Sequence, residues 1–64
     1  MTRDEELWAC ALQVMKVHGD QVGDFILSRI TALEKAGDID GVDTWLMIAE
    51  RVDRLARPHD GPLQ

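Results

Sequence analysis

The sequence predicts an all-α fold, a small three-helix bundle followed by a short tail. Three observations support this prediction. Capping residues stand before each apolar stretch, glycine or proline follows each stretch, and apolar residues recur at helical spacing. The 64 residues suffice for one domain only. We therefore expect a three-helix domain over residues 1–58 and a disordered tail over residues 59–64.

The first helix is expected at about residues 3–18. Thr2 and Glu5 form a capping-box pattern, in which each side chain accepts a hydrogen bond from the backbone of the other residue. Gly19 is suited to end the helix, because glycine adopts the left-handed conformation without steric cost. The apolar residues of this helix cover roughly 220° at about 100° per residue, which is too wide for one neighbour. We therefore expect the first helix to be the central one.

The second helix is expected at about residues 20–36. Asp20 is its candidate N-cap, and Gly37 is placed to end it in the left-handed conformation. Its apolar residues cover roughly 160°, and Leu27 lies outside that arc.

The third helix is expected at about residues 40–57. Asp38 or Asp40 caps it, and Pro58 stops it. Its apolar residues cover roughly 180°, and Met47 lies outside that arc.

Charge and composition exclude several classes of function. The chain has 12 acidic and 7 basic side chains, a net charge of -5. Nucleic-acid phosphates and anionic membranes bind clustered Lys and Arg, so this balance argues against both partners. The single cysteine forms no internal disulfide, and the chain shows neither a signal-peptide pattern nor an apolar run long enough to span a membrane. We expect a cytoplasmic protein.

The groups that suggest chemistry each have a structural explanation. His18, in the last turn of the first helix, is expected to pack on the next helix. Cys10 lies eight residues away, about 12 Å of helix rise, and is expected to be a buried small apolar side chain. The acids of residues 38–43 fail the calcium-loop pattern and suit helix capping. We therefore expect no catalytic residue, no metal, no cofactor and no enzymatic activity.

Arg29 stands in the middle of the apolar face of the second helix. An arginine in that position is paired or extends to the edge of the core. Asp53 lies between Val42 and Leu46 on the apolar face of the third helix, so we expect a buried Arg29–Asp53 ion pair. The alternative is that Arg29 lines a pocket and receives an anionic group.

Five apolar residues are candidates for a protein interface rather than for the core. They are Trp8, Leu12, Met15, Leu27 and Met47. Since a lone bundle of this size is marginally stable, association with a second copy is expected. The predicted function is a non-enzymatic interaction module that self-associates through an exposed apolar face of the first helix. Its partner is an identical copy or another protein.

The alternative function is a small transcriptional or phage-type regulator that binds DNA or a nucleic-acid enzyme. Its sequence feature is the basic cluster Arg51, Arg54 and Arg57. Two acids lie four residues before two of these arginines, Glu50 before Arg54 and Asp53 before Arg57, so local ion pairs compete with phosphate binding. The sequence therefore makes nucleic acid the less favoured partner.

An ordered pattern of residues runs through the three expected helices. It comprises Leu7-Trp8-Ala9-Cys10-Ala11, Val14, His18-Gly19-Asp20, Phe25-Ile26, Arg29-Ile30, Leu33, Ala36-Gly37-Asp38, Gly41-Val42, Trp45, Ile48-Ala49 and Arg51. This pattern resembles a family of short uncharacterised proteins from alphaproteobacteria of the sphingomonad kind, over about residues 3–58. The resemblance implies a bacterial source and transfers no catalytic or binding residue.

Overall fold

The computed structural model describes residues 2–57. Its elements are α1 (Arg3–His18), the short 3-10 helix η1 (Gly19–Gln21), α2 (Val22–Ala36) and α3 (Ile39–Ala56). Residues 2–57 contain no strand, so the predicted all-α fold is confirmed. Pro58 and the expected tail over residues 59–64 lie outside the described residues.

The start of α1 is the capping box that the sequence predicts. The Glu5 N–H donates to Thr2 Oγ1 at 3.1 Å, and the Thr2 N–H donates to Glu5 Oε1 at 2.9 Å. These two bonds satisfy backbone donors that an α-helix leaves free at its first turn. The helix therefore begins at Arg3, as expected.

The connection between α1 and α2 differs from the prediction. Gly19 has a positive φ of 54°, but its ψ of -126° is not that of a left-handed cap. The chain continues through one 3-10 turn, in which the Val22 N–H donates to the Gly19 carbonyl. Because this turn leads directly into α2, the helix begins at Val22 and its N-cap is Gln21. The expected cap by Asp20 is wrong.

The turn between α2 and α3 follows the prediction. Gly37 lies in the left-handed region, at φ 73° and ψ 19°. Asp38 Oδ1 then accepts a hydrogen bond from the Gly41 N–H at 2.9 Å and caps α3. A Cβ at position 41 would lie 2.7 Å from Asp38 Oδ2, so a larger residue there would displace the capping side chain.

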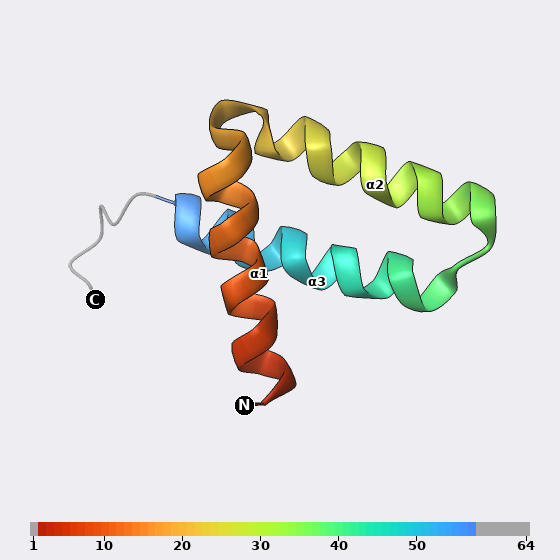
Figure 1. Cartoon of the computed structure of the whole chain (residues 1–64), viewed down its shortest axis with the longest axis horizontal. Coiled ribbons are helices and arrows are strands. Elements are labelled where there is room, and N and C mark those ends of the chain that lie inside the picture. Colours follow the sequence, from red (N-terminus) through yellow and green to blue (C-terminus); the bar gives the residue numbers. More distant parts are fainter. Residues whose placement is uncertain (1, 58–64) are drawn as a thin grey trace.

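The three helices are arranged around α3. Figure 1 shows α2 and α3 side by side and antiparallel, while α1 crosses α3 at a steep angle. Both α1 and α2 pack on α3, and α1 meets α2 less extensively. The expectation that the first helix is central is therefore wrong, because α3 holds that position.

The core contains residues from all three helices. Its buried members are Leu7 and Ala11 of α1, Ile26 of α2, and Ile48 and Val52 of α3. Partly buried side chains surround them, namely Val14, Met15, Val22, Phe25, Ile30, Trp45, Met47 and Ala49. Because α1 packs mainly on α3 and meets α2 less extensively, part of its wide apolar arc has no neighbour. Leu12 and Val17 are consequently 56% and 62% exposed.

Candidate functional site

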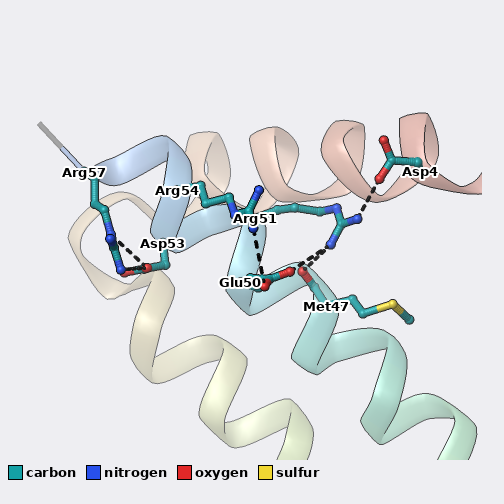
Figure 2. Close-up of polar contacts among 7 residues, drawn as sticks. All are labelled: Asp4, Met47, Glu50, Arg51, Asp53, Arg54 and Arg57. Carbon is teal, nitrogen blue, oxygen red and sulfur yellow. Dashed lines mark hydrogen bonds and ion pairs between the residues drawn. The ribbon is translucent and has the colours of Figure 1, made fainter. Parts of the chain in front are cut away.

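Arg51 of α3 makes a dense set of polar contacts with α1 and with its own helix. Its Nη2 donates to Asp4 Oδ1 at 2.6 Å, and its Nη1 donates to the Met47 carbonyl at 3.3 Å. Nη1 also approaches Glu50 Oε1 at 3.4 Å. Figure 2 shows the guanidinium between the start of α1 and the backbone of α3. Only 15% of the Arg51 side chain is exposed, so this arginine links two helices rather than facing solvent.

Trp8 adds an aromatic contact to the same arginine. The guanidinium carbon of Arg51 lies 5.4 Å from the centre of the Trp8 ring, within the range of a cation–π interaction. Arg51 Nε is buried without a hydrogen-bond partner among the described residues. An unpaired buried donor costs about 1–3 kcal/mol, which reduces the net stabilisation that Arg51 provides. We call Asp4, Trp8 and Arg51 the Arg51 cluster.

A second cluster of side chains comes from all three helices, with His18 from α1, Phe25 and Arg29 from α2, and Trp45 from α3. The His18 ring stacks on Phe25, with ring centres 3.8 Å apart, and Phe25 meets Trp45 edge-on at 5.8 Å. The Arg29 guanidinium lies 5.6 Å from the centre of the Trp45 ring. The prediction that His18 packs on the next helix is confirmed. Through these ring contacts, the end of α1 packs on α2 and α2 packs on α3.

The expected buried pair of Arg29 and Asp53 is wrong. Both residues are exposed. Asp53 accepts hydrogen bonds from Arg57 at 3.1 and 2.8 Å, whereas Arg29 lies over Trp45. The antiparallel packing of α2 on α3 places Arg29 beside Trp45, eight residues before Asp53, which is about two helical turns away.

The five candidate interface residues do not form one surface. Trp8, Met15 and Met47 are half-buried, and the two methionines pack against the core. Leu12 and Leu27 are 56% and 64% exposed, but they lie on α1 and α2 respectively. The structure thus divides the set into three half-buried residues and two exposed leucines on different helices.

Cys10 and the acids of residues 38–43 are further groups for which the sequence suggests chemistry. Cys10 is exposed, so the expectation that it is buried is wrong. It lies outside the stripe of α1 that faces α3, which Leu7 and Ala11 occupy. Within residues 2–57, no group of three or more His, Cys, Asp or Glu side chains is arranged to hold a metal ion. Asp38 acts as the helix cap that the sequence predicts.

The three arginines near the end of α3 all have acidic partners. Arg54 pairs with Glu50 at 3.7 Å, and Arg57 pairs with Asp53 at 2.8 Å, which confirms both pairs expected from the spacing. Arg51 pairs with Asp4 of α1, at a separation in sequence that no helical spacing rule reveals. The Arg51 cluster is therefore the part of the site that sequence reasoning missed.

Comparison with known proteins places the chain in one family. The pattern of a family of unknown function (DUF6961) matches residues 3–60. No curated protein and no solved structure matches the chain. None of the helices within residues 2–57 has the length and apolar character needed to cross a membrane.

Proposed function

This chain belongs to the family of unknown function DUF6961, and we propose that it is a small non-enzymatic protein-interaction module that self-associates. The surface proposed for the contact is the apolar flank, which we define as Trp8 and Leu12 of α1 with Leu55 of α3. Docking an exposed apolar helical surface against an identical copy removes that surface from water.

The observation that carries this proposal is the exposed apolar surface beside the Arg51 cluster. Leu12 lies one turn after Trp8, and Leu55 lies one turn after Arg51, so helical spacing places each leucine next to one residue of the Trp8–Arg51 contact. They are 56% and 39% exposed. The flank therefore combines two exposed leucines with the half-buried Trp8, and tryptophan is enriched in protein interfaces.

A second copy is the partner that the size of the core favours. Only five hydrophobic residues are buried within residues 2–57. Chains of this length often gain the remaining stability from oligomerisation. DNA binding receives no comparable support, because Arg51, Arg54 and Arg57 already have acidic partners.

The test compares two exposed apolar residues of α1. Leu12→Ala removes an exposed side chain of the flank, and Val17→Ala is the control, an exposed apolar residue about 140° around the helix from Leu12. Losing about three buried carbons per copy weakens self-association on the order of tenfold or more. We expect light scattering coupled to size exclusion to show a lower mass for Leu12→Ala and an unchanged mass for Val17→Ala.

One result would contradict the proposal. If Leu12→Ala keeps its helical circular dichroism and associates like the wild type, the apolar flank is not the contact surface.

A further inference from the structure

The outer face of α2 carries a shallow concavity that is largely open to solvent. Its lining residues all belong to this helix, namely Asp24, Leu27, Ser28, Thr31, Ala32 and Lys35. At about 100° per residue they centre on the side of α2 opposite the buried Ile26. The concavity therefore faces away from α3, and Leu27 at its rim is 64% exposed.

The charges on this face stand at its two ends. Asp24 lies in the first turn of α2 and Lys35 in the last turn. Eleven residues separate them, about three turns or 16 Å, so both point to the same side. Neither forms an ion pair within residues 2–57, unlike the arginines of α3.

These positions are self-complementary under a two-fold rotation. When two α2 helices pack antiparallel about a point between Ser28 and Thr31, Asp24 of each copy stands opposite Lys35 of the other. The same rotation sets Leu27 opposite Ala32, a large side chain against a small one, and Ser28 opposite Thr31. Small residues at the centre let two helices approach closely.

We propose that the outer face of α2 docks against the same face of a second copy in antiparallel orientation. A parallel arrangement would set like charges together, whereas the antiparallel one forms two ion pairs and opposes the helix dipoles favourably. A single helix pair is a small interface of the weak, transient class.

This contact does not depend on the apolar flank proposed above, because the two surfaces lie on different helices. A chain that uses both self-complementary surfaces assembles beyond a dimer, and a tetramer with two kinds of two-fold contact is a closed form available to it. A chain that uses only one of them stops at the dimer.

The experiment reverses each charge and then combines the variants. Lys35→Glu sets a glutamate opposite Asp24, and Asp24→Lys sets two lysines together, so each variant alone loses both ion pairs. We expect each to weaken the contact about tenfold and to lower the mass seen by light scattering at high protein concentration. Lys16→Glu, on the exposed side of α1, is the control with the same charge change as Lys35→Glu.

Mixing the two variants tests the pairing itself. In the mixed dimer the lysine introduced at position 24 of one variant meets the glutamate introduced at position 35 of the other. The unchanged Asp24 and Lys35 of the two variants also meet, so both ion pairs return. Native mass spectrometry with one variant labelled with ¹⁵N is expected to show the mixed dimer in preference to either homodimer.

The outcomes separate this inference from the proposed function. A mass lowered by Lys35→Glu and unchanged by Leu12→Ala supports the α2 contact and removes the apolar flank. The α2 contact is overturned if Lys35→Glu and Lys16→Glu have the wild-type mass, if mixing gives no preference for the mixed dimer, or if the wild type is monomeric throughout.

Discussion

The α2–α3 hairpin and α1 are attached to the core in different ways. The hairpin helices lie side by side and antiparallel, and its turn is closed by Gly37 and the Asp38 cap (Figure 1). In contrast, α1 crosses α3 at a steep angle, contributes the buried Leu7 and Ala11 to the core, and makes polar contacts with α3 at its start through the Arg51 cluster.

This difference in packing predicts how substitutions affect the stability of each region. Side-by-side helices share apolar contact along their length, so the hairpin depends on packing and on a correctly formed turn. The crossing helix contributes two buried residues to the core, against one from α2, and within residues 2–57 the Arg51 cluster gives it an ion pair to α3 that α2 lacks. The same geometry leaves Leu12 of α1 exposed, as the proposed interaction module requires.

The largest loss of stability is expected from a substitution in the core that the hairpin and α1 share. Ile48 is 3% exposed and belongs to the core cluster that all three helices share. Ile48→Ala is expected to lower the free energy of unfolding by about 2–5 kcal/mol, since it leaves a cavity. Urea unfolding followed by circular dichroism measures this, with the 74% exposed Ile39 as control. If Ile39→Ala costs as much, the core is wrongly placed.

A smaller loss of stability is expected from a substitution in the turn between α2 and α3. A Cβ at position 41 would displace Asp38, so Gly41→Ala is expected to lose the α3 cap and about 1 kcal/mol of stability. Gly23→Ala in α2 is the control, because a Cβ there meets no atom within 4 Å. It is expected to stabilise by about 0.4–1 kcal/mol. Equal signs for the two variants in thermal unfolding would contradict the close approach at Gly41.

The smallest effect addresses the attachment of α1. Arg51→Met removes the ion pair to Asp4 and the cation–π contact, and it also removes the buried unpaired Nε, so the net loss is about 1 kcal/mol or less. Amide hydrogen exchange is expected to rise in the first half of α1 and to change little in α2. Arg54→Met, which removes an exposed pair, is the control. Uniformly faster exchange would show that Arg51 does not anchor α1 in particular.

Much of the helical arrangement was predictable from local sequence. The capping box at Thr2, the left-handed Gly37 and the Asp38 cap are set by neighbouring residues, so the starts of α1 and α3 and the end of α2 agree with expectation. Gly19 ends α1 with a positive φ, as expected, but its ψ of -126° leads into a 3-10 turn, so α2 begins at Val22 without a cap by Asp20.

The candidate site was less predictable from the sequence. Helical periodicity predicts on which face of a helix a residue lies, but it does not predict which residue of the neighbouring helix lies opposite. Arg29 and Asp53 both fall on predicted apolar faces, yet the packing register puts Arg29 beside Trp45. The Arg51–Asp4 pair joins residues 47 positions apart, a separation that only the crossing of α1 over α3 brings together.

The measurement that tests self-association most directly is the mass of the wild-type chain in solution. Light scattering coupled to size exclusion should cover a hundredfold range of concentration, with a reducing agent present so that the exposed Cys10 forms no disulfide between copies. We expect the mass to rise with concentration above the 7.2 kDa of one chain. A mass that stays at 7.2 kDa at every concentration would contradict self-association through either surface.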